Sequence, residues 1–135
     1  YHEGLAAIKG VYKSLLKEVG PEDDYQVYSS SQEWFELDPE FFESFNEQRG
    51  ALNLNVNALL ADCQMAREYQ ANPKKYGITV KTFESSSSFK TNIVIVPSQI
   101  IIHYLGTPTW AMVLRNRHIA QALGDLFKSA WDRID

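Results

Sequence analysis

Hydroxyl, amide and indole side chains gather in the segment "SSSQEW", which follows a short apolar and aromatic run at 25–29. In open α/β sheets, ligands favour the carboxyl ends of parallel strands, where loops and helix N-termini present hydrogen-bond donors. A polyol or sugar needs paired donors and acceptors, and its apolar face stacks on an indole ring. The segment predicts a recognition edge made of Ser29, Ser30, Ser31, Gln32 and Trp34. The alternative is that the serines only turn the chain and Trp34 only caps the core.

Side chains suited to catalysis are few. Cys63 is the single cysteine and has no defined histidine partner, so we expect a small buried hydrophobe. His103 lies inside "IIIHYLG", where a hydrogen-bonded sheet histidine is the simplest interpretation. His118 starts the last helix and is expected to be solvated. We expect no metal or cofactor, because the sequence contains no Gly-rich phosphate loop, no GxSxG and no closely spaced metal ligands.

Helical and strand-like segments must position these residues. Apolar residues at three- and four-residue spacing predict helices, and alternating or wholly apolar runs predict strands. Asp38 is expected to cap a helix with Pro39 at its first position, and Pro97-Ser98 predicts a hairpin turn. The "SSSS" tract at 85–88 predicts a loop. The expected helices lie at 5–20, from 39 onward, 62–73 and 116–134, and the expected strands at 25–29, 52–62, 78–83, 91–96, 99–105 and 109–114.

The order of these elements predicts an α/β domain with a mixed β-sheet of about six strands and helices on both faces. The βα units of the first half imply parallel strands, and the later hairpins imply antiparallel ones. The expected inward residues of the 52–62 strand are Leu52, Leu54, Val56, Ala58 and Leu60. The expected buried stripe of the last helix is Ile119, Ala122, Leu123, Leu126, Phe127, Ala130 and Trp131.

Length and composition restrict the class of protein. With 135 residues, 44% of them hydrophobic, the chain is expected to form one domain, residues 1–135. A net charge of −4 argues against non-specific nucleic-acid binding, since phosphate neutralisation needs clustered Lys and Arg. One cysteine excludes an internal disulfide and favours a reducing, cytoplasmic setting. No membrane contact is expected, because no apolar run approaches the ~20 residues of a membrane span.

Several segments together resemble a known family. They are "EGLAAIKGVYKSLLKE", "YQVYSSSQEW", "FFESFNEQR", a strand ending in "LLAD", and "SFKTNIVIVPSQIIIHYLGTPTWAMVLRNRHIAQALGDLFKSAWDRI". Their order and spacing resemble the effector domain of TrmB-like transcription regulators, a family best represented in archaea. The resemblance covers nearly the whole chain and implies a phospholipase D-like fold. It also implies that a winged-helix DNA-binding domain precedes this fragment, so DNA is a partner only through that missing domain.

Phospholipase D-like enzymes use a His-x-Lys-x-x-x-x-Asp motif, in which the histidine attacks phosphorus and the lysine stabilises phosphate charge. Those three positions fall here on Lys90, Asn92 and Pro97, and none retains the catalytic residue type. The resemblance therefore implies a module that is not an enzyme. Lys90 and Asn92 remain candidates to line a ligand pocket, with Lys90 suited to an anionic or polar ligand.

Effector sensing is the leading hypothesis that the resemblance supports. The effector state of this domain would bias an attached DNA-binding domain. Ser29, Asp62 and Asn92 are expected to orient the ligand, with Asp62 placed just after the second strand. Sugar-responsive members of the family carry an additional C-terminal domain, whereas this chain ends at Asp135. The small polar effector therefore stays open between a sugar and an anionic metabolite.

Two alternatives stay open beside sensing. One is a divergent phospholipase D-like phosphodiesterase that uses Lys90, Asn92 or His103. The other is a purely structural dimerisation module. A homodimer is expected, although core packing is the commoner fate of apolar residues such as those of the proposed contact. The residues of that contact are the strand "TWAMVL" with Trp110, and the helical residues Phe127 and Trp131.

Overall fold

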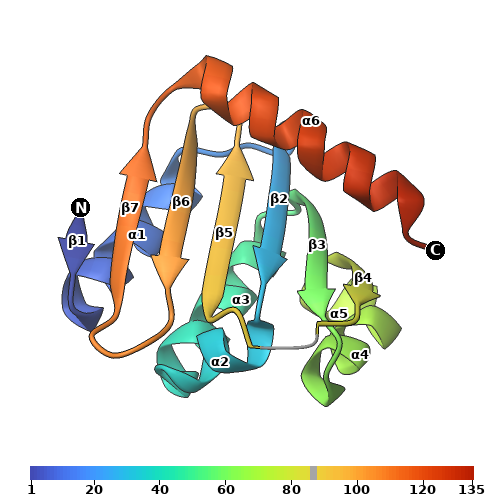
Figure 1. Ribbon diagram of the computed structural model, residues 1–135, viewed down its shortest axis with the longest axis horizontal. Helices are drawn as coiled ribbons and strands as arrows, with labels where there is room; N and C mark the ends of the chain where they lie inside the picture. The colour runs from blue at the N-terminus through green and yellow to red at the C-terminus, as the bar shows by residue number, and fades with distance from the viewer. Residues whose placement is uncertain (86–87) are drawn as a thin grey trace.

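A mixed sheet of seven strands runs through the centre of the molecule, in the order β1-β7-β6-β5-β2-β3-β4 (Figure 1). The computed structural model describes residues 1–85 and 88–135. β2, β3 and β4 run parallel, and β5, β6 and β7 are antiparallel to their neighbours, as the order of βα units and hairpins predicted. The strands are β1 (His2–Glu3), β2 (Asp24–Ser29), β3 (Asn55–Ala61), β4 (Thr79–Phe83), β5 (Thr91–Val96), β6 (Gln99–Tyr104) and β7 (Trp110–Leu114).

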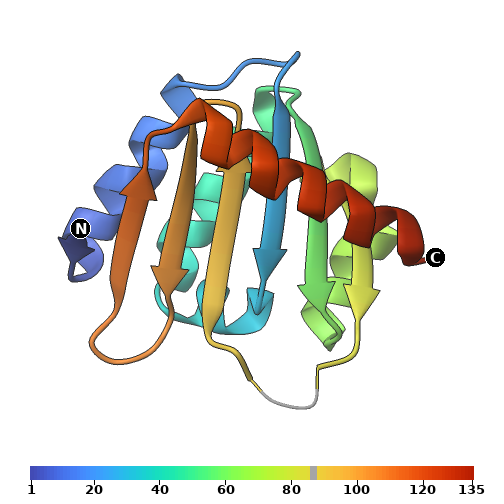
Figure 2. The same ribbon diagram turned by 45° about the horizontal axis from the view of Figure 1, so that its top comes forward.

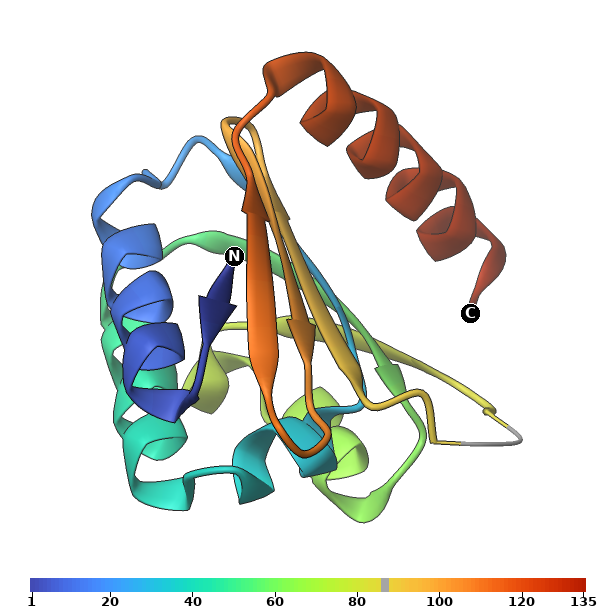
Figure 3. The ribbon, with the colours of Figure 1, turned by 60° about the vertical axis from the view of Figure 1, so that its left-hand side comes forward.

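Helices cover both faces of the sheet, but unequally (Figure 3). In the described part of the chain, one face carries five helices, which are α1 (Leu5–Lys17), α2 (Ser31–Glu36), α3 (Pro39–Ala51), α4 (Gln64–Ala71) and α5 (Pro73–Tyr76). The opposite face carries α6 (Arg117–Arg133), which runs obliquely across the strands (Figure 2). The α/β class with a mixed sheet and helices on both faces is confirmed.

The prediction of about six strands is wrong by one strand. β1 pairs antiparallel with β7, with His2 opposite Ala111 and Glu3 opposite Trp110. A strand of two residues is too short to show the alternation that reveals strands in a sequence. It forms only because β7 offers free backbone groups beside it.

The strand predicted at 52–62 begins later, at Asn55. α3 continues to Ala51, and Asn53 adopts a left-handed backbone conformation with φ of 53°. Asparagine tolerates that conformation better than most residues, and it is a common helix terminator. Leu52 is therefore 43% exposed and does not belong to the inward set. The other predicted inward residues are buried: Leu54, Val56, Ala58 and Leu60.

Side chains cap the helices that flank the parallel strands. Asp38 Oδ1 accepts a hydrogen bond from the Phe41 N–H at 3.1 Å, and Pro39 occupies the first turn of α3, which confirms the predicted cap. Cys63 Sγ accepts from the Ala66 N–H at 3.4 Å at the start of α4. Cys63 is half-buried, so it combines the expected apolar packing with a capping role that the sequence did not indicate.

α6 buries a narrow sector against its face of the sheet. Ala120 and Phe127 pack there on Leu59, Ile95 and Ile100. Four residues of the predicted stripe are exposed instead: Ile119, Ala122, Leu126 and Ala130. On this face the described part of the chain supplies no second helix beside α6, so one apolar side of the helix stays uncovered.

The connections on either side of β5 follow the sequence prediction in part. Pro97-Ser98 turns the chain from β5 into β6 as a tight hairpin. In the predicted serine loop, residues 86 and 87 lie outside the described residues. No helix within residues 1–85 and 88–135 combines the length and apolarity needed to cross a bilayer.

Candidate ligand-binding site

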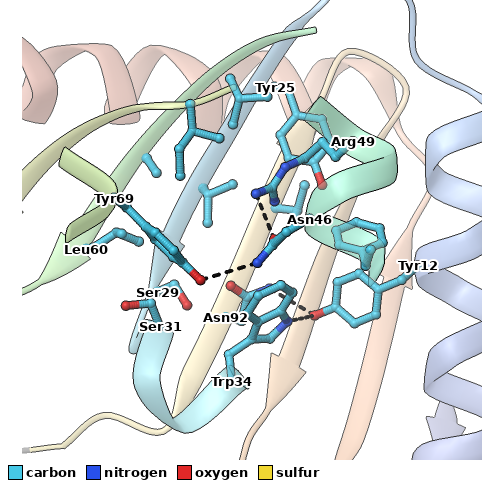
Figure 4. Close-up of a pocket in the computed structure, with 16 residues that line it drawn as sticks. Tyr12, Tyr25, Ser29, Ser31, Trp34, Asn46, Arg49, Leu60, Tyr69 and Asn92 are labelled. Atoms are coloured by element: carbon cyan, nitrogen blue, oxygen red, sulfur yellow. Dashed lines mark hydrogen bonds between the residues drawn. The ribbon is translucent and has the colours of Figure 1, made fainter. Parts of the chain in front are cut away.

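A small cavity lies between the sheet and the helices α2, α3 and α4 (Figure 4). Its volume is about 30 Å³, which is room for about two water molecules. β2, β3 and β5 form one wall, and Tyr12 reaches the cavity from α1. The cavity therefore touches most of the elements on the five-helix face.

Regular spacing on β2 and α3 places the polar groups of this cavity. Tyr25 and Ser29 are an even number of residues apart on β2, so they share one face of the sheet. Asn46 and Arg49 are three residues apart on α3, so they point to the same side of that helix. The wall between these polar groups is apolar, and its residues are Val27, Val56, Ala58, Leu60 and Val94.

Arg49 is the unusual residue of the cavity, because it is a cation with only 6% of its surface exposed. Its Nη2 donates to Asn46 Oδ1 at 2.9 Å. Its guanidinium carbon lies 5.5 Å from the ring centroid of Phe45 and 5.9 Å from that of Tyr25, within cation–π range. Among the described residues, the salt bridges do not include Arg49, and its Nε has no hydrogen-bond partner. A buried cation here lacks the carboxylate that usually accompanies one.

Two hydroxyl groups in the same lining are also unpaired. By hydrogen-bond geometry, neither the buried Tyr25 hydroxyl nor the buried Ser29 Oγ has a partner among the described residues, although the Arg49 guanidinium lies close enough to the Tyr25 hydroxyl to act as a weak donor. Burial raises the pKa of Tyr25, although the charge of Arg49 acts in the opposite direction, so this hydroxyl keeps its proton. A buried polar atom without a partner costs about 1–3 kcal/mol, and all three such atoms border one cavity. We call Tyr25, Ser29, Asn46, Arg49 and Tyr69 the Arg49 cluster.

A second polar cluster, three of whose members also line the cavity, is connected by a continuous chain of hydrogen bonds. The Tyr12 hydroxyl accepts from Trp34 Nε1 at 3.0 Å and from Asn92 Nδ2 at 2.9 Å. Because both lone pairs are used, its own proton goes to His103 Nδ1 at 2.8 Å. His103 Nε2 then donates to Thr109 Oγ1 at 2.9 Å. We call Tyr12, Trp34, Asn92, His103 and Thr109 the Tyr12 cluster.

His103 is the buried histidine of the sheet that the sequence predicted. It is 0% exposed, and desolvation lowers its pKa to about 4. Desolvation also raises the pKa of Tyr12, so both members of the pair stay neutral over the physiological range. Since both ring nitrogens of His103 already have partners, the histidine holds β6 to α1 and to the residues before β7.

The structure brings four of the seven predicted ligand-binding residues to the cavity: Ser29, Ser31, Trp34 and Asn92. Ser31 Oγ also lies 3.9 Å from Cys63 Sγ. Trp34 is 6% exposed, and its ring centroid lies 4.2 Å from that of Phe42. Trp34 thus lines the cavity and also packs in the core, so it fits both the recognition role and the core role that the sequence allowed.

The other three predicted residues lie elsewhere. Ser30 is buried at the start of α2, but its side chain is not part of the cavity lining. Asp62 is exposed and accepts two hydrogen bonds of 2.8 Å from Arg67, which lower its pKa. Lys90 is exposed, with a φ of 43°. Asp62 and Lys90 therefore do not reach this cavity.

Sequence reasoning missed the residues of the helices that complete the cluster. Arg49 follows Phe42 and Phe45 at spacings of seven and four, so it lies on the side of α3 that was predicted to be buried. That position was the available signal. Tyr25 and Tyr69 gave no comparable signal, because buried tyrosines are common and their hydroxyls usually find partners.

The arrangement suits binding better than bond making. A buried guanidinium with two unpaired hydroxyls offers donors to oxygen atoms of a ligand. Within the described residues, no three His, Cys, Asp or Glu side chains gather to hold a metal ion. The only histidine near the cavity among the described residues is His103, whose ring nitrogens are both engaged.

Comparison with known proteins identifies a fold but no family. Neither a protein-family model nor a curated protein matches the sequence. A solved structure of TrmBL2, an archaeal chromatin protein described as showing a novel mode of DNA binding, is similar with a TM-score of 0.67 and 10% sequence identity. The match covers 98% of this chain and 49% of that one, so this chain spans about half the length of its structural neighbour. At this identity the likeness shows a shared fold.

Proposed function

We propose that this chain is a non-catalytic, ligand-sensing domain of a TrmB-like transcription regulator with a phospholipase D-like fold. The observation that carries the proposal is the buried guanidinium of Arg49, which borders a cavity without a carboxylate partner among the described residues. A domain that needed only a core would be as stable or more stable with an apolar residue there. The likeness of fold to TrmBL2 supports a place in a regulator that binds DNA.

The absence of catalysis is part of the proposal. Lys90, Asn92 and Pro97 occupy the positions of the phospholipase D-like catalytic residues, and none of them is a nucleophile of that chemistry. A phosphodiesterase built on His103 receives less support, because this histidine is buried and hydrogen-bonded on both sides.

Coupling to DNA binding would pass through α1. Tyr12 lines the cavity from α1 and is bonded to Trp34 of α2 and to His103 of β6. α1 begins beside the N-terminus (Figure 1), where the resemblance places a winged-helix domain. A ligand that binds two placements of α1 with different affinity shifts their populations, and through them the DNA-binding domain. Such a regulator would work in the cytoplasm, where its DNA is.

Self-association through α6 completes the proposal. Phe127, which the sequence suggested as a contact, is buried against the sheet and is unavailable. Leu126 is 65% exposed and Ile119 is 44% exposed on one side of the same helix, and Met112 of β7 is 38% exposed. We expect Leu126→Glu to convert a dimer to a monomer in sedimentation velocity, while the neighbouring surface change Gln121→Glu leaves the dimer intact. A monomeric wild-type protein at high concentration would contradict this part.

A thermal-shift screen against sugars, sugar phosphates, nucleotides and small organic acids tests the sensing function. A compound that binds only the folded state at about 100 times its Kd should raise Tm by roughly 5 °C or more. Ser29→Ala should reduce the shift, and the exposed Ser44→Ala, on the same face of the molecule, should leave it unchanged. If no compound shifts Tm of the folded protein, the structural dimerisation module is the better description.

A further inference from the structure

We infer that the cavity takes a small organic acid, whose carboxylate binds Arg49 and Tyr25 and whose short apolar stem points toward Ser29. The inference rests on the proposed sensing function and names its class of ligand. It follows from three features of the Arg49 cluster: the missing negative charge, the distribution of polar atoms, and the size of the cavity.

The missing charge selects an anion over a neutral polyol. Arg49 is 6% exposed, and no acceptor for its Nε–H is found in residues 1–85 and 88–135. Asn46, which accepts the hydrogen bond from Arg49 Nη2, offers an amide oxygen and no negative charge. A carboxylate would supply the charge and two acceptor oxygens, and arginine–carboxylate hydrogen bonds are about twice as strong as neutral ones. The Tyr25 hydroxyl, which also lacks an acceptor, lies beside the guanidinium and can donate to the same group (Figure 4).

The distribution of polar atoms selects an acid with an apolar stem. Tyr25 and Ser29 are four residues apart on β2, so their Cα atoms are about 13 Å apart. The wall between them consists of valine, alanine and leucine side chains. The Tyr69 hydroxyl, which also borders the cavity, accepts a hydrogen bond from Asn46 Nδ2 (Figure 4). A sugar carries hydroxyls along its whole length and would leave them unpaired against that wall.

The size of the cavity limits the length of the acid. About 30 Å³ is room for about two water molecules, so even a two-carbon acid, with four non-hydrogen atoms, requires some lining side chains to move, and a longer stem requires more movement. Asn46 and Tyr69 border both the cavity and a surface groove of about 470 Å³ between α3 and α4. The hydrogen bond from Asn46 Nδ2 to the Tyr69 hydroxyl separates the cavity from the groove. It is long at 3.3 Å and therefore weak, so it can open to admit a ligand.

The groove outside this closure does not attract anions. Its charged lining residues are Glu43, Glu47, Glu68 and Lys75. A negative mouth slows the association of an anion, and added salt screens that repulsion. The acidic groove affects mainly the rate of association, whereas the affinity at equilibrium depends on the contacts of the bound anion. The test is therefore an equilibrium measurement at a constant, moderate ionic strength set with sodium chloride.

The test compares a charged ligand with neutral molecules of the same shape. Wild-type protein is titrated with sodium acetate, sodium butyrate and sodium 4-hydroxybutyrate, and in parallel with their amides acetamide, butyramide and 4-hydroxybutyramide, and Tm is followed. We expect at least one acid to raise Tm while its neutral counterpart does not. Arg49→Met, which keeps the length of the side chain and removes its charge, should lower the affinity for that acid at least about tenfold. Arg67→Met is the matched control, because Arg67 is exposed and paired with Asp62, and it should bind like the wild type.

Each other outcome has a separate meaning. Equal shifts with an acid and its amide, or an acid shift that survives in Arg49→Met, would overturn the anion inference and leave the sensing function standing. A shift with sugars alone would do the same. If no compound of either screen shifted Tm, both the anion inference and the proposed sensing function would be rejected. If Arg49→Met does not fold, Tyr25→Phe replaces it: a wild-type affinity for the acid in that variant would overturn the inference.

Discussion

The Tyr12 cluster and the Arg49 cluster share one face of the sheet and differ in a single respect, the completeness of their hydrogen bonding. In the Tyr12 cluster every donor meets an acceptor, from the Trp34 indole through the Tyr12 hydroxyl to His103 and Thr109. In the Arg49 cluster three buried polar atoms have no geometrically formed hydrogen bond within the described part of the chain, and they border a cavity. Apart from the half-buried Thr109, the residues of both clusters are buried, so burial alone does not distinguish them.

The difference separates a polar group that builds the fold from one that is available to a ligand. A paired buried network recovers the cost of desolvation and specifies one arrangement of the helices and strands. An incomplete network leaves that cost unrecovered until another molecule supplies the partners. A substitution in the Tyr12 cluster should therefore lower mainly the stability of the fold, and a matching substitution in the Arg49 cluster should lower mainly the affinity for a ligand.

The largest expected effect is that of Tyr12→Phe. It removes one oxygen that serves three buried partners, Trp34 Nε1, Asn92 Nδ2 and His103 Nδ1. Each unpaired partner costs about 1–3 kcal/mol, so we expect a loss of roughly 3 kcal/mol or more in the free energy of unfolding. Urea denaturation at pH 7.5 measures it. A loss below about 1 kcal/mol would mean that water replaces the hydroxyl and that the cluster is less sealed than its geometry indicates.

The next effect is a dependence of stability on pH that comes from His103. Its pKa is about 4 in the folded protein and about 6.5 in the unfolded chain, so protons favour the unfolded state. The stabilisation is complete above pH 6.5 and is lost as the pH falls toward 4. Between pH 7.5 and pH 5 we expect a loss of about 2 kcal/mol, measured by urea denaturation. His103→Gln should be less stable than the wild type at pH 7.5, but its free energy of unfolding should change little between pH 7.5 and pH 5. If the variant lost as much stability over this interval as the wild type, the loss would come from other titratable groups.

Tyr25→Phe should be the small counterpart of Tyr12→Phe. Among the described residues the Tyr25 hydroxyl makes at most a weak hydrogen bond with the Arg49 guanidinium, which keeps its bond to Asn46, so removal of the hydroxyl leaves no neighbour newly without a partner. We expect the free energy of unfolding to stay within about 0.5 kcal/mol of the wild type or to rise slightly. The same urea titrations, run side by side, measure both variants. A destabilisation of about 2 kcal/mol or more would show that Tyr25 has a partner in solution, and the contrast between the clusters would disappear.

The smallest effects are expected outside both clusters. Asp62 and Lys90 lie at exposed positions away from the cavity. Asp62→Asn removes an exposed ion pair with Arg67, and Lys90→Ala removes a solvated charge, so neither should alter the ligand-induced shift in Tm. A lost shift in either variant would place the ligand at the outer edge of the sheet instead of in the cavity.

Much of the fold could be predicted because periodicity is local. The parallel and antiparallel parts of the sheet, the hairpin at Pro97-Ser98 and the Asp38 cap all follow from patterns within about ten residues. The failures have a non-local cause. β1 exists because β7 lies beside it, and Leu126 is exposed because nothing in the described chain covers that side of α6.

The residues of the candidate site likewise fall into those that the sequence could reveal and those that only the structure could reveal. Composition and the end of β2 were sufficient to select Ser29, Ser31 and Trp34, since polar residues after a strand are visible in the sequence. They were not sufficient to select Arg49, since an arginine in a helix is ordinarily solvated, and only burial among Phe45, Tyr25 and Asn46 makes it unusual. Asp62 and Lys90 were attractive by residue type, but both face solvent.

The sequence by itself determined the α/β class of the fold and most of the order of its elements, because residue types and their local spacing carry that information. The tertiary structure decided which buried polar groups have partners. The Tyr12 hydroxyl meets residues 22, 80 and 91 positions away, and Arg49 finds no carboxylate within reach among the described residues. Pairing of this kind depends on where distant segments come to lie, and no local pattern contains it.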